Sequence, residues 1–183
     1  MSEKYKIRDQ ERCYFVTFAV VEWIDVFTRR IYKELLVDSL KYCQKEKGLE
    51  IFAWCIMTNH AHLIVRSDGS NQLENIIRDF KKYTSVQIIK EITENNQESR
   101  KKWLLWMFSK KAETSKKHQK YWFWQNEYHP IELSDSKMMD QKLNYLHMNP
   151  VEAGLVDNPE EYVYSSARDY AGNKGLVDIK FLE

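Results

Sequence analysis

The residues best suited to chemistry are His60 and His62, which only one alanine separates in the run 54–65. The next three residues, Leu63-Ile64-Val65, indicate a β-strand, and residues i and i+2 of a strand point to the same face. Both imidazoles would project together, while Ala61 packs on the opposite face. Neutral imidazole nitrogens bind divalent metals, so the pair predicts two ligands of a site whose third ligand comes from elsewhere. The alternative is a pair of histidines on a solvated face, since two ligands do not make a site.

A second group of chemically useful side chains lies on a predicted helix near the C-terminal third. Tyr145 and Asn149 are four residues apart and share one face, and Lys142 lies three residues before the tyrosine on roughly the same face. Leu143 and Leu146 point elsewhere and suit a core. The helix can therefore present a phenol, an amide and an ammonium to one place, although a tyrosine at the boundary of a core is the alternative.

Hydrophobic periodicity and capping residues predict the elements that position these groups. The pattern predicts a strand over 14–21, then a helix from the N-cap Thr28 to Lys47 with Gly48 as its C-cap. A strand over 49–57, a turn at 58–59 and a strand from His60 follow, and then a helix from about Gln72 with an apolar stripe to Ile92. Strand or irregular structure is expected over 121–133, before a helix over 136–149 that Ser134-Asp135-Ser136 caps and Pro150 ends.

The order strand, helix, strand, strand, helix and a further strand is typical of an α+β, ferredoxin-like fold. We expect an antiparallel sheet with helices packed on one face, plus a C-terminal catalytic helix and tail. The length of 183 residues predicts one domain over 1–183. Within it we expect a basic, partly mobile insertion over 93–120 and an acidic C-terminal tail over 151–183.

The net charge of +1 hides a strong asymmetry along the chain. Residues 76–120 carry 12 Lys and Arg against 5 Asp and Glu, and residues 121–183 carry 5 against 11. A basic middle third predicts a surface for a polyanion, although a solvated helix face laced with salt bridges has the same composition. The three cysteines form no CxxC pair, and no run is long and apolar enough to cross a bilayer, so we expect a cytoplasmic protein with reduced cysteines and no membrane association.

Two motifs together resemble those of a known family. Met57-x-Asn59-His60-x-His62 is followed about 80 residues later by Asn144-Tyr145-x-His147-x-Asn149-Pro150-Val151-x-Ala153-Gly154-Leu155-Val156. This combination resembles the single-tyrosine HUH transposases, and among them the REP-associated tyrosine transposases. Further agreement at 25–27, 80–85 and 164–167 extends the resemblance over most of the chain.

The resemblance implies a metal-dependent DNA-nicking and strand-joining enzyme. Carried over by position, Tyr145 is the catalytic nucleophile, and His60, His62 and Asn149 are the ligands of a divalent metal, Mg²⁺ or Mn²⁺, with which Zn²⁺ could compete. The implied substrate is single-stranded DNA that forms a hairpin. The tyrosine would form a 5′-phosphotyrosine and release a 3′-hydroxyl, a step that a second 3′-hydroxyl can reverse.

Basic residues are the candidates for contacts with DNA phosphates, and two tryptophans are candidates for stacking on bases. The alternative for Trp103 and Trp106 is packing in the core. The basic candidates are Arg78, Lys81, Lys82, Arg100, Lys101, Lys102 and Lys142.

Several alternatives stay open at this point. Tyr83 is a rival nucleophile, His147 is more typical of a structural or substrate contact than of a ligand, His129 could approach the metal or be a satisfied polar residue, and His118 lies among lysines. A non-catalytic DNA-binding protein and a replication or relaxase nickase are the rival functions. Relatives act as monomers or as homodimers, so either state is compatible with the sequence.

Overall fold

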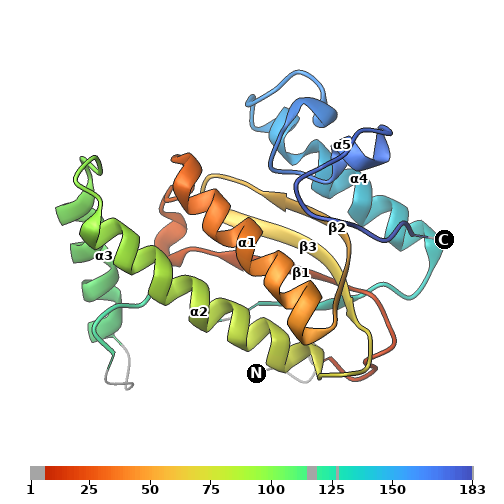
Figure 1. Ribbon diagram of the computed structural model, residues 1–183, viewed down its shortest axis with the longest axis horizontal. Coiled ribbons are helices and arrows are strands. Elements are labelled where there is room, and N and C mark those ends of the chain that lie inside the picture. The colour runs from red at the N-terminus through yellow and green to blue at the C-terminus, as the bar shows by residue number, and fades with distance from the viewer. Residues whose placement is uncertain (1–6, 115–118, 127, 183) are drawn as a thin grey trace.

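The centre of the protein is a four-stranded antiparallel sheet in the order β2-β3-β1-β4 (Figure 1). The computed structural model describes residues 7–114, 119–126 and 128–182. The strands are β1 (Tyr14–Ala19), β2 (Leu49–Ile56), β3 (His60–Ser67) and β4 (Ile131–Glu132). This strand order is that of a ferredoxin-like sheet, so the predicted fold class is confirmed.

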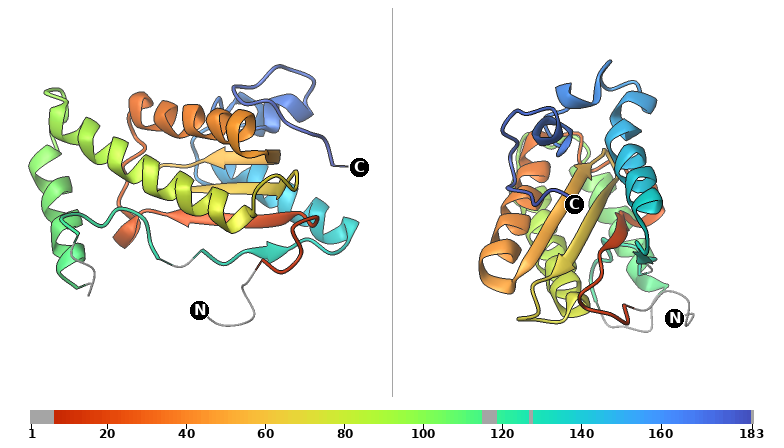
Figure 2. Two further views of the ribbon diagram at one scale, coloured as in Figure 1. Left: turned by 60° about the horizontal axis from the view of Figure 1, so that its bottom comes forward. Right: turned by 90° about the vertical axis from the view of Figure 1, so that its right-hand side faces the viewer.

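Two long helices, α1 (Arg30–Lys47) and α2 (Leu73–Glu94), cover one face of the sheet (Figure 2). The apolar stripe predicted for α2 is buried along its whole length. Gly48 ends α1 in the left-handed region at φ 72°, as predicted, and its N–H donates to the carbonyl of Cys43. The predicted start of α1 is wrong by one position at the cap, because Arg29 and not Thr28 takes the N-cap.

The helix α4 (Ser136–Glu152) lies on the opposite face of the sheet from α1 and α2 (Figure 2). Asp135 caps it by accepting a hydrogen bond from the backbone N–H of Met138, as the sequence predicts. The predicted end at Pro150 is wrong, because the helix continues to Glu152. Proline removes only one hydrogen bond here, and the last turn is closed by the bonds Ala153 N–H to Asn149 and Leu155 N–H to Pro150.

The basic segment 93–120 contains a helix that the sequence analysis did not assign, α3 (Lys101–Glu113). It lies beyond one end of the sheet, where Leu104 and Phe108 are buried in the larger core (Figure 1). Residues 115–118 of this segment, with His118, lie outside the described residues. Of the strand or irregular structure expected over 121–133, only Ile131–Glu132 pair as a strand.

The C-terminal tail runs along the outer edge of β2. It contains the short helices η3 (Pro159–Glu161) and α5 (Ala167–Tyr170). The backbone N–H of Ser166 donates to the carbonyl of Trp54, and the N–H of Ile56 donates to the carbonyl of Tyr164. The tail thus satisfies polar groups that a free strand edge would leave exposed.

Two apolar cores result, a larger one between the sheet and α1 and α2, and a smaller one between the sheet and α4. The three cysteines are buried and unpaired, as expected. Within the described part of the chain, no helix has both the length and the apolar character needed to cross a membrane.

Candidate active site

The two histidines of β3 face α4 and lie on the far side of the sheet from α1 and α2. His62 pairs with Thr17 and His60 with Ala19 across the β1–β3 ladder. The imidazole ring centroids are 4.7 Å apart. Ala61 belongs to the larger core on the other face. The expected i, i+2 projection of the two rings is therefore confirmed, and the face they line is the one that carries α4.

His62 is buried, with 4% of its surface exposed, and its two ring nitrogens have different surroundings. Its Nδ1 is 2.8 Å from the hydroxyl oxygen of Thr17, whereas its Nε2 is buried without a hydrogen-bond partner. We assign the proton to Nδ1, with the Thr17 hydroxyl accepting, which leaves a lone pair on Nε2. Phe15 stacks against the ring at a centroid distance of 5.2 Å.

The environment keeps the His62 imidazole neutral. Burial lowers its pKa to about 3, and the nearby charges of His60 and Lys142 act in the same direction. A neutral imidazole with a free, buried Nε2 is the form in which histidine binds a metal. The hydroxyl of Thr17 does here what outer partners of ligand histidines commonly do, since it fixes the orientation of the ring.

His60 lies at the start of β3, and carboxamides surround it. Its Nδ1 is 2.7 Å from Oδ1 of Asn59, and the side chain of Asn149, whose amide donates to the carbonyl of Tyr145, lies close to the ring. Burial lowers the pKa of His60, while the Asn149 side chain and the charge of Asp25 oppose this shift. Trp23 lies edge-on to the imidazole at a centroid distance of 5.5 Å. Asn149 on α4 and His60 on β3 are thus brought together, as the resemblance implied.

Tyr145 projects from α4 towards His62. The two ring centroids are 5.3 Å apart, and 43% of the tyrosine surface is exposed. The ammonium of Lys142 lies 5.0 Å from the ring centroid of Phe15 and 5.6 Å from that of Tyr145. The helix that carries the tyrosine packs on β2 and β3 of its own chain. A single chain therefore assembles an exposed phenol, a cation, two imidazoles and a carboxamide.

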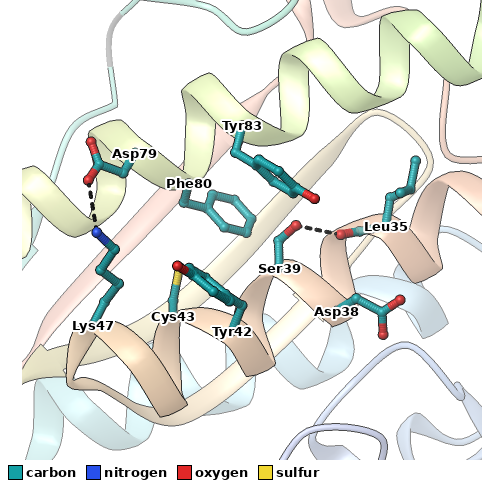
Figure 3. Close-up of a pocket in the computed structure, with 9 residues that line it drawn as sticks. All are labelled: Leu35, Asp38, Ser39, Tyr42, Cys43, Lys47, Asp79, Phe80 and Tyr83. Atoms are coloured by element: carbon teal, nitrogen blue, oxygen red, sulfur yellow. Dashed lines mark hydrogen bonds and ion pairs between the residues drawn. The ribbon is translucent and has the colours of Figure 1, made fainter.

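The rival nucleophile Tyr83 lies on α2, so the sheet separates it from the histidine pair. Figure 3 shows it above an apolar groove between α1 and α2, opposite Tyr42. Both of these tyrosines are 57% exposed. The groove also contains Phe80 and Cys43, and it presents no histidine. The structure thus brings only one of the two candidate tyrosines, Tyr145, to the histidines.

His147 faces away from this group and towards the C-terminal tail. Its Nε2 is 2.9 Å from the hydroxyl of Ser166, its ring packs on Tyr170 at 5.1 Å, and burial lowers its pKa to about 4. These contacts are structural, which is one of the two roles, structural or substrate contact, that the sequence favoured over that of a ligand. His129 is exposed in the segment before β4.

The basic candidates for DNA contacts do not form one surface. Arg78 and Lys82 are exposed on α2 and line a hollow of about 660 Å³ with Tyr121 and Trp122. Lys81 turns inward, because its ammonium donates to the carbonyl of Gln125 at 2.7 Å. Lys142 belongs to the opposite face of the sheet, beside Tyr145.

The remaining basic candidates lie at the start of α3. The Arg100 guanidinium donates to the carbonyl of Asp25 at 2.7 Å and to the hydroxyl of Thr28 at 3.0 Å, so it ties this helix to the loop before α1. Lys101 and Lys102 occupy the first turn. Trp103 and Trp106 are 46% and 55% exposed, so the alternative of core packing is wrong for them.

Sequence reasoning missed three residues that contact the histidines: Phe15, Thr17 and Trp23. Their contacts depend on the register of β1 against β3 and on the path of the loop after β1. The side chain of Asn59 was part of the motif, but its bond to His60 could not be foreseen.

Comparisons with known proteins agree with this architecture. The family model described as "Transposase IS200 like" matches residues 13–120, a range that includes both histidines and ends before Tyr145. None of the curated proteins matches the sequence.

Two solved structures are similar to this one. The structure of a REP-associated tyrosine transposase bound to a REP hairpin has a TM-score of 0.65 and 18% identity, and the match covers 100% of this chain and 96% of that chain. A crystal structure of a Deinococcus radiodurans R1 protein assigned as a transposase has a TM-score of 0.47 and 13% identity, with 79% of this chain and 98% of that chain covered. The first likeness confirms the fold.

Proposed function

Since the chain belongs to the IS200-like transposase family, we propose that it cleaves and rejoins single-stranded DNA with Tyr145 as the nucleophile, as a member of the REP-associated branch. One observation carries this proposal. An exposed tyrosine lies 5.3 Å, ring to ring, from a buried histidine whose Nε2 has no partner. An unpartnered buried nitrogen is costly, so a group that binds it belongs beside the tyrosine.

A divalent metal fits the residues at this site. His62 offers a free lone pair on a neutral ring, and Asn149 brings a carboxamide to His60. In the described part of the chain, no group of three or more His, Cys, Asp or Glu side chains is placed to hold a metal, and the third protein ligand that we propose is the carboxamide of Asn149. Mixed nitrogen and oxygen ligands suit Mn²⁺, and Mg²⁺ is the hard alternative. The bound metal would supply Lewis-acid stabilisation of the phosphate oxygens.

The chain's own residues would perform the transfer in one displacement. The Tyr145 phenol loses its proton and its oxygen attacks the scissile phosphorus. The bond from phosphorus to the 3′-oxygen breaks, and that oxygen takes up a proton and leaves as a 3′-hydroxyl. The 5′-phosphate stays on the tyrosine, so the energy of the bond is conserved and a second 3′-hydroxyl can reverse the step. The Lys142 ammonium, 5.6 Å from the ring centroid of Tyr145, would attract the approaching phosphate, because the phosphate is an anion.

The proposed substrate is single-stranded DNA that carries a hairpin. The structure described as a REP-associated tyrosine transposase was solved with such a hairpin. The exposed cations Arg78, Lys82 and Lys102 and the exposed Trp103 and Trp106 support contacts with phosphates and bases. The residues of the proposed site lie together within one chain, and a homodimer stays a prediction.

A covalent-adduct assay tests this proposal. Wild type, Tyr145→Phe and Tyr83→Phe are mixed with a pool of hairpin-bearing single-stranded oligonucleotides and Mn²⁺, with and without chelator, and run on a denaturing gel. We expect a chelator-sensitive adduct in wild type and Tyr83→Phe and none in Tyr145→Phe, with DNA binding retained in all three. Sequencing the released 3′-hydroxyl fragment identifies the cleaved oligonucleotide.

The other outcomes separate the rival functions. Equal adduct formation by Tyr145→Phe would remove the assigned nucleophile. Binding to the pool without any adduct would favour the non-catalytic DNA-binding protein. Cleavage that ignores the hairpin would favour the nickase.

A further inference from the structure

Trp23 is a large apolar side chain left exposed at the edge of the active site. It is 53% exposed, and its ring forms a T-shaped pair with that of His60, with centroids 5.5 Å apart and an interplanar angle of 72°. The flat face of an exposed tryptophan is suited to stacking on a nucleobase. With 53% of the side chain exposed, part of the Trp23 ring is accessible to such a partner.

The backbone that carries Trp23 is strained. Glu22 and Trp23 are consecutive residues in the left-handed region, at φ 54° and 53°, and neither is glycine. Such conformations cost about 1–3 kcal/mol each, and they persist only where surrounding contacts enforce them. They also concentrate at ligand-binding and catalytic sites.

Contacts from two sides enforce this conformation. The amide of Asn59 donates to the carbonyl of Trp23 at 3.1 Å, while its oxygen bonds His60. From α3, the ammonium of Lys111 pairs with the carboxylate of Glu22 at 2.7 Å. The side chain of Asn59 therefore links the backbone of Trp23 to the candidate metal ligand His60. The ion pair with α3 restrains the same loop from the side away from the histidines.

The side chains at the site contact one another in succession, with ring centroids 5.3 Å apart for Tyr145 and His62, 4.7 Å for His62 and His60, and 5.5 Å for His60 and Trp23. In phosphoryl transfer the attacking and leaving oxygens lie roughly in line on opposite sides of the phosphorus. A phosphate bound beside the histidine pair and attacked by Tyr145 would thus send its leaving 3′-oxygen away from Tyr145, to the side of the site where Trp23 contacts His60.

We propose that Trp23 stacks on the base of the nucleotide on the 5′ side of the scissile phosphate, the nucleotide that leaves with the 3′-hydroxyl. This inference rests on the proposed function, since that function defines the scissile phosphate. Trp23 binds substrate in this role and takes no part in proton transfer. The strained loop holds the ring ready, so the base stacks without ordering a mobile side chain.

The test combines protein variants with abasic substrates. Wild type, Trp23→Ala and Trp23→Phe are given the cleaved oligonucleotide intact, with an abasic site 5′ of the scissile phosphate, or with an abasic site 3′ of it. Single-turnover adduct formation is measured over a range of DNA concentrations, which separates binding from chemistry. Trp106→Ala, which truncates an equally exposed tryptophan on α3, is the matched control.

We expect Trp23→Ala to slow adduct formation on intact DNA by on the order of 10-fold to 100-fold, as loss of one base stack does, and Trp23→Phe to retain most of the rate. The 5′ abasic site should slow wild type by a similar factor and should add little further loss to Trp23→Ala. The 3′ abasic site should slow adduct formation by the same factor in wild type and in Trp23→Ala. Trp106→Ala should leave the 5′ abasic effect unchanged.

Two results would overturn the inference while leaving the proposed function intact. One is an unchanged rate in Trp23→Ala. The other is a double change, Trp23→Ala with the 5′ abasic site, that slows adduct formation by the product of the two separate factors. Such independent effects would show that Trp23 acts on the fold of the loop and not on that base. Failure of wild type to form any Tyr145-dependent adduct would instead overturn the proposed function, and the stacking inference with it.

Discussion

The two faces of the sheet differ in what they bury, although the same strand supplies both. On the α1 and α2 face, β3 contributes Ala61, Leu63 and Val65 to the larger core, where buried apolar side chains provide most of the stability. On the α4 face, β3 contributes the two histidines, and a buried imidazole nitrogen is left without a partner. One face can hold a costly polar arrangement because the other stabilises the fold independently.

The largest effect on the α4 face is expected from His62→Ala. The variant loses the free Nε2 of the proposed metal site, and metal Lewis acids contribute several kcal/mol to such reactions. We expect Mn²⁺ binding, measured by electron paramagnetic resonance, to be lost and adduct formation to fall by on the order of 1,000-fold. The free energy of unfolding without metal should change little, because the removed ring carries an unsatisfied buried nitrogen. Retained Mn²⁺ binding would exclude His62 from the ligand set.

The matched substitution one residue along the chain, Leu63→Ala, should lower the free energy of unfolding and leave metal binding and adduct formation unchanged. Leu63 is 3% exposed in the larger core, and truncating such a leucine costs about 2–5 kcal/mol. We expect urea unfolding, monitored by tryptophan fluorescence, to show this loss. At a temperature where the variant stays folded, its adduct rate and Mn²⁺ affinity should equal those of wild type. Slower adduct formation by Leu63→Ala at unchanged free energy of unfolding would contradict the inference that the α1 and α2 face stabilises the fold while the α4 face carries the chemistry.

Periodicity and spacing were sufficient to predict the fold class and the residues that share a face of one element, because both depend on local geometry. That the two sets of residues meet was implied by the family resemblance. A strand places His60 and His62 on one face, and a helix does the same for Lys142, Tyr145 and Asn149. The structure then brings the two sets into contact. Their chemical roles stay predictions until the adduct and metal measurements are made.

What could not be predicted depends on contacts between segments distant in the chain. The bond from Thr17 to His62 requires the β1–β3 register, and the position of Trp23 requires a strained loop that Asn59 and Lys111 hold from outside. The helix α3 was missed for a related reason. Its lysines dominate the local pattern, while its buried side results from packing against the rest of the protein.

A smaller effect is expected from Thr17→Val, which keeps the shape of the side chain and removes the hydroxyl next to His62. Without that partner, Nδ1 no longer has a fixed proton and the ring is held less firmly. Loss of such outer partners lowers metal affinity by about 10-fold to 100-fold. Thr84→Val is the control, because Thr84 is a buried threonine that lies on α2. It should lower stability and leave Mn²⁺ affinity unchanged, and equal affinity loss in both variants would contradict the role of Thr17.

The smallest effect concerns a polar group at the margin of the α2 face. Burial lowers the pKa of the Lys81 ammonium to about 8, from an ordinary value of 10.5. Between these two values the unfolded chain binds more protons than the folded protein, so the stability that Lys81 confers rises with pH. Below about pH 8 both states are protonated, and the cost of burying the charge is felt in full.

Lys81→Met removes this dependence. Wild type should therefore gain stability relative to the variant by on the order of 1 kcal/mol between about pH 7 and pH 9.5, measured by urea unfolding. Lys82→Met controls for the loss of one positive charge from the same helix. Parallel pH profiles for wild type and Lys81→Met would mean that the ammonium is hydrated in the folded protein. The core between the sheet and α2 would then exclude charge even at its margin, whereas the α4 face keeps the buried, unpartnered Nε2 of His62.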